Sequence, residues 1–341
     1  MDAFNPLVSI IIPVYNGSNY LNEAIDSALA QTYKKIEVLV INDGSEDGNE
    51  TEQIVLSYGT RIRYFYKPNG GVASALNLGI EKMNGEYFSW LSHDDKYYNN
   101  KIEKQVERLK ELSDKTTVIF SGWSVIGNNG KVIHHVLPLN RYSEKQLGIP
   151  LFALFHGQIN GCSLLVHKSH FERVGLFNEQ LPTTQDYDLW FRIMRNAKIV
   201  CCEDVLSMTR IHRQQVSKKV CKEHSAEADN LWIHMMDTLF EQEKININGS
   251  EYSFYKNIYC LMLSFSTNMK AAKYARHRAC TELRKTNVCT RYYFKLVWLF
   301  LSGYGALVYY FFSSLKEVGI LNTLKRVLYA INRLTCSKMD K

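Results

Sequence analysis

The first hundred residues alternate between short apolar runs rich in β-branched residues and segments whose apolar residues recur every three or four positions. The run LVSIIIPVYN starts at residue 7, and Leu21, Ala24, Ile25 and Ala28 follow it at helical spacing. The alternation continues through IEVLVIND, EQIVLSYG, IRYFYK, GVASALNLGIEKM and EYFSWLS. Continuous apolar strands that alternate with helices are typical of parallel sheets covered on both faces. The pattern predicts an α/β fold with a doubly wound, mixed but mostly parallel sheet of the Rossmann-like kind.

Sheets of this kind bind ligands beyond the carboxyl ends of their strands. Polar or glycine residues follow each predicted strand: Tyr15 the first, Asp43 the second, Gly71 the third, and Asp94 with Asp95 the fourth. We expect these residues to converge on one pocket. For Asp43 and Gly71 an ordinary turn remains the alternative, because Asp and Gly are common in turns anyway.

The stretch YFSWLSHDDKYY ends an apolar run on two adjacent carboxylates, Asp94 and Asp95. Neighbouring carboxylates repel each other, so the pair indicates either a solvated turn or a bound cation. The chain has no G-x-G-x-x-G after its first strand and no G-x-x-x-x-G-K-[ST] loop, the two commonest phosphate-holding motifs. A divalent cation is then the expected phosphate holder, whereas His93 is more simply a strand-end side chain than a ligand.

The distribution of charge argues against a nucleic-acid partner. The net charge is +7, but the segment from residue 270 onward carries 14 Lys and Arg against 3 Asp and Glu, so the rest of the chain is acidic. The basic tail surrounds an aromatic apolar run and contains no groove-reading motif. The eight cysteines form no C-x-x-C pair and the first strand is broken by Pro13, which predicts a cytoplasmic protein with reduced thiols.

Several linked segments resemble the inverting glycosyltransferases of family 2, which have the GT-A fold. The matching segments are VSIIIPVYNGSNYLNEAIDSALAQTYKKIEVLVINDGSEDG, NGGVASALNLGIEKMNGEYFSWLSHDD, GLFNEQLPTTQDYDLWFRI and RIHRQQVS. The resemblance covers residues 7 to about 217, and the order of the segments is more specific than any one of them. It implies a nucleotide-diphospho-sugar donor, Mg²⁺ or Mn²⁺, and direct displacement at the anomeric carbon.

The resemblance also implies roles for single residues. The metal ligands would be Asp94, helped by Asp95 and completed by His212, with Arg210 and Arg213 suited to a phosphate. The family's Asp-x-Asp motif is altered here, because Ser92 occupies the first acidic position of SHDD. The predicted donor-binding residues are Pro13, Tyr15, Asp43, Gly71, Ser92 and Asp94.

The stretch TTQDYDLW supplies the candidate base, Asp186, which would take the proton of the attacking hydroxyl. The family usually has Glu-Asp here, and this chain has Gln185 before Asp186. Acidic residues that favour a helix N-terminus are an equally good explanation of Asp186 and Asp188. Trp190 is a candidate to stack on the acceptor sugar, although a core position explains it as well.

We expect a GT-A domain at 1–220, with a donor half at 1–98 and an acceptor half at 99–220, and a helical, basic region at 221–341. The aromatic segment 292–312 predicts contact with the inner face of the cell membrane, and a buried helical hairpin is the alternative. That location suits a glycan acceptor on a lipid diphosphate, as in surface polysaccharide synthesis. Two alternatives stay open: a degenerate nucleotide- or glycan-binding module and a metal-dependent nucleotidyltransferase.

Overall fold

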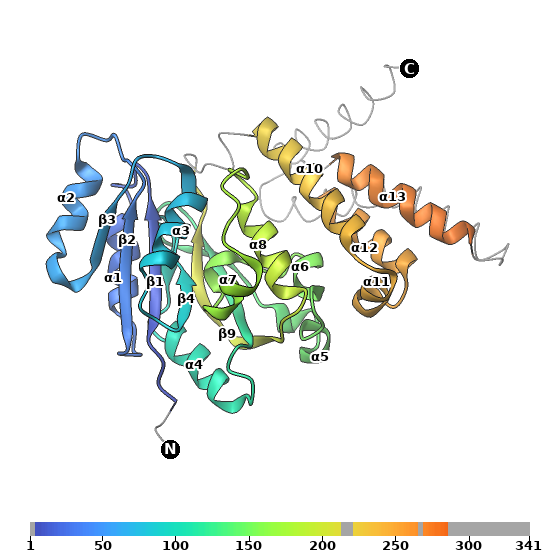
Figure 1. Cartoon of the computed structure of the whole chain (residues 1–341), viewed down its shortest axis with the longest axis horizontal. Helices are drawn as coiled ribbons and strands as arrows, with labels where there is room; N and C mark the ends of the chain where they lie inside the picture. Colours follow the sequence, from blue (N-terminus) through green and yellow to red (C-terminus); the bar gives the residue numbers. More distant parts are fainter. Residues whose placement is uncertain (1–3, 213–220, 265–268, 286–341) are drawn as a thin grey trace. The chain divides into compact units, whose positions relative to one another are not determined.

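The computed structural model describes residues 4–212, 221–264 and 269–285 (Figure 1). The chain divides into two compact units, Met1–Val220 and Cys221–Lys341. Among the described residues no helix has both the length and the apolar character needed to cross a bilayer. The segment 292–312, for which membrane contact is predicted, lies outside the described residues.

The first sheet has five strands in the order β3-β2-β1-β4-β8. Its first four strands are parallel, and the short β8 is antiparallel to β4. Strands β1 and β2 consist almost wholly of buried side chains, as expected for strands covered on both faces. The bounds are β1 (Val8–Val14), β2 (Ile36–Asn42), β3 (Arg63–Tyr66), β4 (Tyr87–Trp90) and β8 (Val166–His167). The predicted doubly wound α/β sheet is confirmed.

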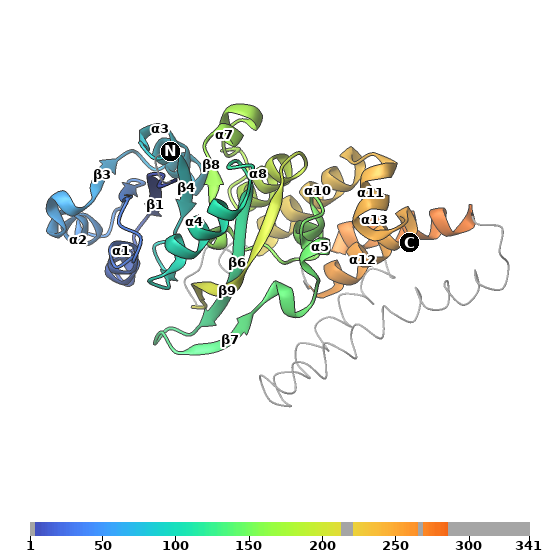
Figure 2. The same cartoon turned by 90° about the horizontal axis from the view of Figure 1, so that it is seen from below.

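Helices cover both faces of this sheet. Figure 2 shows α3 (Gly71–Lys82) on one side of the strands and α1 (Leu21–Leu29) on the other, where α2 (Glu50–Ser57) lies next to α1. Helix α3 lies very close to β1, since a Cβ built on Gly79 would come within 2.4 Å of Cγ2 of Ile11. Glycine at this position therefore lets the helix approach the strand.

A second sheet of four strands, in the order β5-β9-β6-β7, continues the fold. The bounds are β5 (Lys96–Tyr97), β6 (Val118–Ile126), β7 (Val132–Val136) and β9 (Ile199–Arg210). Strand β9 runs parallel to β6 and antiparallel to β5. The apolar segments TTVIFSGWSVI and KVIHHVL, on either side of the turn GNNG, predict two strands, which the structure shows as β6 and β7. No strand was predicted for β9, whose mixture of buried and exposed residues has no regular alternation.

The apolar residues of the segment GCSLLVHK predict one strand over its whole length, and the structure shows that this prediction is wrong. The side chain of Asn160 accepts a hydrogen bond from the Cys162 N–H and starts a 3-10 turn over Gly161–Ser163. Only Val166–His167 then pairs with β4. The remaining helices of this unit are α4 (Lys101–Glu111), α5 (Glu144–Leu147), α6 (Phe152–Phe155), α7 (Ser169–Val174) and α8 (Gln185–Met194).

The second unit is helical in its described part, as expected for the region 221–341. It contains α10 (Cys221–Thr238), α11 (Glu241–Asn248), α12 (Glu251–Ser264) and α13 (Met269–Arg284). The carboxylate of Asp229 accepts hydrogen bonds from the N–H groups of Lys270 and Ala271, which satisfies free donors at the start of α13.

Glu37 holds together the amino-terminal edge of the first sheet. It accepts hydrogen bonds from the Ser9 hydroxyl and the Asn84 N–H, and pairs with Arg63 at 2.6 Å. Burial by itself raises the pKa of Glu37, but the hydrogen bonds from Ser9 and Asn84 and the charge of Arg63 outweigh it, so the pKa lies below its ordinary value of 4.5.

Replacing Glu37 with Gln should lower the free energy of unfolding by about 2 kcal/mol, because Arg63 and two N–H groups lose a charged acceptor. The depressed pKa also means that wild type gains this stability above pH 4.5 and loses it as the pH falls through the native pKa. Thermal unfolding at pH 7 and pH 3.5 measures the difference in stability between wild type and Glu37→Gln, which should be larger at pH 7 than at pH 3.5. Glu81→Gln, at an exposed ion pair, is the control, and an equal loss there would contradict the assignment.

Candidate active site

The loops that follow the parallel strands meet at one edge of the first sheet, as predicted. The Asp43 N–H donates to the carbonyl of Val14, which joins the ends of β1 and β2. A Cβ on Gly17, in the loop after β1, would come within 2.5 Å of the His93 ring, in the turn after β4. These contacts bring the ends of β1, β2 and β4 together.

Asp43 organises the loop that leads into α3. Its buried carboxylate accepts hydrogen bonds from Lys67 Nζ at 2.6 Å, from the Gly70 N–H at 3.0 Å and from the Gly71 N–H at 2.8 Å. Gly71 has φ +87°, and a Cβ built on it would meet open space. Both Asp43 oxygens thus have protein partners, which favours the turn-forming alternative over a direct ligand role. Lys67, which was not among the predicted site residues, is the charged residue beside it.

The two residues predicted to pack on a base, Pro13 and Tyr15, differ in exposure. Pro13 is buried within β1, opposite Ile41 of β2, and offers no surface to a ligand. The assignment of Pro13 to the base-packing edge is therefore not supported by its position. Tyr15 is 42% exposed directly after β1 ends, so its ring is available.

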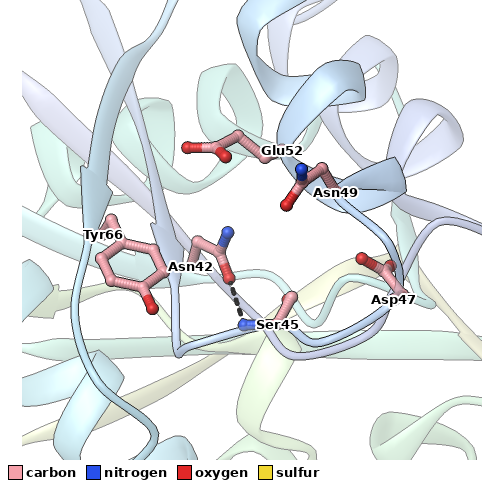
Figure 3. A pocket seen from close by; sticks show the side chains of 6 residues that line it. All are labelled: Asn42, Ser45, Asp47, Asn49, Glu52 and Tyr66. Carbon is pink, nitrogen blue, oxygen red and sulfur yellow. Dashed lines mark hydrogen bonds between the residues drawn. The ribbon is translucent and has the colours of Figure 1, made fainter.

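A polar pocket of about 240 Å³ lies beyond the ends of β2 and β3. Figure 3 shows its side chains, including the Asn42 amide that accepts a hydrogen bond from the Ser45 N–H. Asn42, which lines the pocket, directly precedes Asp43 in the chain, so the pocket belongs to the same edge of the sheet. The residues that line it are Asn42, Ser45, Asp47, Asn49, Glu52 and Tyr66.

The SHDD turn brings Asp94 to His212. The turn starts at the end of β4 and closes through the Asp95 N–H, which donates to the Ser92 carbonyl. Oδ2 of Asp94 lies 2.8 Å from Nε2 of His212, which follows β9 by two residues. Asp94 is half-buried and His212 is buried. The long strand that the sequence pattern did not predict therefore delivers the histidine to the carboxylate.

Asp95 points away from this pair. Its buried carboxylate accepts hydrogen bonds from the Arg210 N–H at 2.8 Å and from Sγ of Cys162 at 3.4 Å. Burial, and then the neighbouring charge of Asp94, raises the pKa of Asp95 well above its ordinary value. The position of Asp95 is thus at odds with the prediction that it adds charge to a metal site. Ser92 is half-buried, and its hydroxyl oxygen lies 3.7 Å from the same sulfur.

A buried polar cluster lies beneath the turn. Lys101 of α4 is fully buried and donates from Nζ to the Ser89 hydroxyl and to the Gln105 side chain. The Tyr97 hydroxyl donates to the carbonyl of Trp90, the last residue of β4. Burial lowers the pKa of Lys101 to about 7. The cluster ties α4 and β5 to the strand from which the SHDD turn starts.

Asp94 and His212 would supply two protein ligands to a divalent cation that a bound phosphate also ligates. One carboxylate oxygen and one imidazole nitrogen, from Asp94 and His212, lie side by side. Within the described residues, no group of three or more His, Cys, Asp or Glu side chains could hold a metal ion. Mg²⁺ and Mn²⁺ commonly take few protein ligands and complete their shell with phosphate oxygens and water, so two protein ligands suffice for such a site.

Asp186 lies in the first turn of α8, half-buried, and accepts a hydrogen bond from the Tyr187 N–H. The loop before this helix is attached to α3, because Asn77 exchanges hydrogen bonds with the backbone of Phe177. The Phe177 ring lies 6.3 Å from that of Trp90 at the end of β4. Because the Phe177 ring also lies 5.8 Å from that of Trp190, it links helix α8 to the end of the strand that leads into SHDD.

Other predicted contacts in this region are core residues. Trp190 is fully buried and packs against Phe177, so the sugar-stacking role predicted for it does not fit and the core alternative does. Gln185 is buried too, and an uncharged amide there avoids the desolvation of a Glu carboxylate. Asp188 pairs with Arg192 at 2.6 Å. Arg210, expected near a phosphate, has no exposed surface, and Arg213 lies outside the described residues.

Comparisons with known proteins agree with this architecture. The profile of glycosyl transferase family 2 matches residues 9–173. An uncharacterised glycosyltransferase of Rickettsia typhi is 49% identical over 257 residues, which are 75% of this chain and 80% of the relative. The chain belongs to glycosyl transferase family 2. A longer relative, an uncharacterised glycosyltransferase of Rickettsia bellii, is 53% identical over 254 residues, 74% of this chain but 37% of the relative.

The chain spans less than half the length of the relatives from Rickettsia bellii, Rickettsia conorii and Rickettsia felis. A more distant one, the chondroitin synthase of Pasteurella multocida, is 29% identical over 248 residues, 72% of this chain and 23% of that protein.

Two solved protein structures resemble this one. S. aureus TarS in complex with UDP-GlcNAc superposes with a TM-score of 0.56 at 15% identity, covering 80% of this chain and 88% of that one. The mannosyltransferase PcManGT of Pyrobaculum calidifontis, in complex with GDP-Man and Mn²⁺, has the same TM-score and identity and covers 96% and 88%. These similarities establish the GT-A fold of this family 2 chain.

Proposed function

We propose that the protein transfers a sugar from a nucleotide-diphospho-sugar to a hydroxyl group of an acceptor glycan, with inversion of the anomeric carbon. The observation that carries the proposal is the Asp94–His212 pair at the carboxyl edge of a family 2 fold. Structural neighbours that bind UDP-GlcNAc, or GDP-Man with Mn²⁺, support a nucleotide-sugar donor.

In this mechanism the donor lies along the edge formed by the loops after β1 to β4. The exposed ring of Tyr15 packs against the nucleobase, and the open side of Gly71 admits the donor close to the backbone. Asp94 and His212 would hold Mg²⁺ or Mn²⁺, and the cation would supply positive charge to neutralise the leaving group. Asp43 shapes this edge through Gly70 and Gly71, and Ser92 borders it.

On the acceptor side, Asp186 accepts the proton of the attacking hydroxyl. A sugar hydroxyl is a weak nucleophile until its proton is removed in the transition state, and a half-buried carboxylate can accept it at neutral pH. The first turn of α8 holds Asp186, and packing of Trp190 in the core fixes the helix. Attack opposite the leaving group inverts the anomeric carbon.

The acceptor is proposed to be a growing surface glycan, such as O-antigen or capsule, on a lipid diphosphate at the cytoplasmic face of the membrane. Similarity to a chondroitin synthase supports a glycan acceptor, and the aromatic segment 292–312 with the basic residues that flank it supports a membrane surface. Residues 1–98 would form the donor half and 99–220 the acceptor half.

Thermal unfolding with nucleotides tests the donor site. UDP, GDP, CDP and dTDP are each added at millimolar concentration with Mn²⁺ or with a chelator, because a ligand that binds only the native state raises its Tm. We expect one nucleotide to raise the Tm only when Mn²⁺ is present. If no nucleotide raises the Tm, the chain is a degenerate binding module instead of a transferase. NMR of the product's anomeric proton then tests inversion.

A further inference from the structure

Arg210, the last residue of β9, has no solvent-exposed surface. Its guanidinium donates to the Asp94 carbonyl at 2.9 Å and pairs with Glu23 of α1 at 2.9 Å. It also donates to the carbonyl of Asn128, in the turn between β6 and β7. Burying a guanidinium is costly unless its donors are satisfied, and here three separate segments satisfy them.

The same guanidinium is also connected to His212 through an aromatic ring. It lies over the Tyr20 ring at 4.3 Å, and that ring lies 5.2 Å from the His212 ring. Between Arg210 and His212, the Ile211 N–H donates to the Ile126 carbonyl, and the Ile211 side chain is exposed. His212 is buried two residues beyond Arg210, on the chain that the guanidinium anchors.

We propose that Arg210 is a positioning residue that sets Asp94 and His212 at the separation a shared divalent cation requires. It touches neither the substrate nor the cation, and it acts through the Asp94 backbone and the Tyr20 ring. The proposal rests on the proposed function, since it assumes that Asp94 and His212 bind the cation. The fork of a guanidinium can reach these acceptors at once, whereas a lysine ammonium with its single nitrogen cannot.

The test is the Mn²⁺ concentration that gives half of the nucleotide-induced rise in Tm. Groups that orient metal ligands typically contribute 10–100-fold to metal affinity, so Arg210→Lys should raise this concentration about tenfold or more. Glu23→Gln keeps the guanidinium but removes its charged partner, and should shift the concentration in the same direction by less. Lys96→Met removes the other partner of Glu23, 3.1 Å away, and should leave the concentration unchanged.

The outcomes separate the two proposals. If wild type shows no Mn²⁺-dependent rise in Tm, the proposed metal site fails, and the role of Arg210 fails with it. If wild type shows the rise and Arg210→Lys lowers only the basal Tm, Arg210 is merely structural and this inference alone is overturned. Should Arg210→Lys not fold, Glu23→Gln decides, because an unchanged Mn²⁺ concentration in that variant contradicts the positioning role.

Discussion

Asp186→Asn is expected to lower the rate of sugar transfer about a thousandfold while leaving nucleotide binding nearly unchanged. A positioned general base typically contributes 10²–10⁴-fold, and Asn has the same shape but cannot accept the hydroxyl proton. Asn also keeps an oxygen for the hydrogen bond from the Tyr187 N–H, so the start of α8 should persist. The measurements are single-turnover transfer and the nucleotide-induced rise in Tm.

Asp188→Asn is the matched control, because Asp188 lies in the same helical turn and pairs with Arg192. We expect transfer close to the wild-type rate and a loss of stability below about 1 kcal/mol. If Asp186→Asn transfers sugar near the wild-type rate, or if both variants lose activity equally, the acidic residues serve the helix N-terminus and Asp186 is not the base.

Asp94→Asn should abolish the part of the nucleotide-induced rise in Tm that depends on Mn²⁺, and should slow transfer about a hundredfold or more. The substitution replaces one carboxylate oxygen by an amide nitrogen and removes the negative charge that attracts the cation. A titration of Mn²⁺ at fixed nucleotide, followed by Tm, measures the loss directly.

Asp95→Asn distinguishes the two neighbouring carboxylates. Asp95 is buried with a raised pKa, and an Asn oxygen can still accept the hydrogen bond from the Arg210 N–H. The Mn²⁺-dependent rise in Tm should therefore survive in Asp95→Asn. A loss of the rise in Asp95→Asn, with retention in Asp94→Asn, would restore the original prediction that Asp95 binds the cation and would remove Asp94 from the site.

The residues of the candidate site were predictable to unequal degrees. Asp94 and Tyr15 follow buried strands, and the carboxyl edge of a parallel sheet brings such residues together whatever the loops do. The roles of Asp95, Pro13 and Trp190 in the site could not be predicted from the sequence, because a strand or turn pattern does not show which way a single side chain points. The roles of Lys67 and Arg210 depend on contacts with residues far away in the chain.

The sequence alone determined the order of strands and helices in the donor half, because apolar runs and helical periodicity are local properties of the chain. Strands that alternate with helices pack as a mostly parallel sheet with helices on both faces. It also located the edge of the sheet at which the proposed site lies. Only the tertiary structure decided that β9 pairs with β5 and β6 and so carries His212 to Asp94. The Asp94–His212 contact joins residues more than a hundred positions apart. The local pattern of side chains in β9 is irregular, and such a pattern does not determine which distant strand it pairs with.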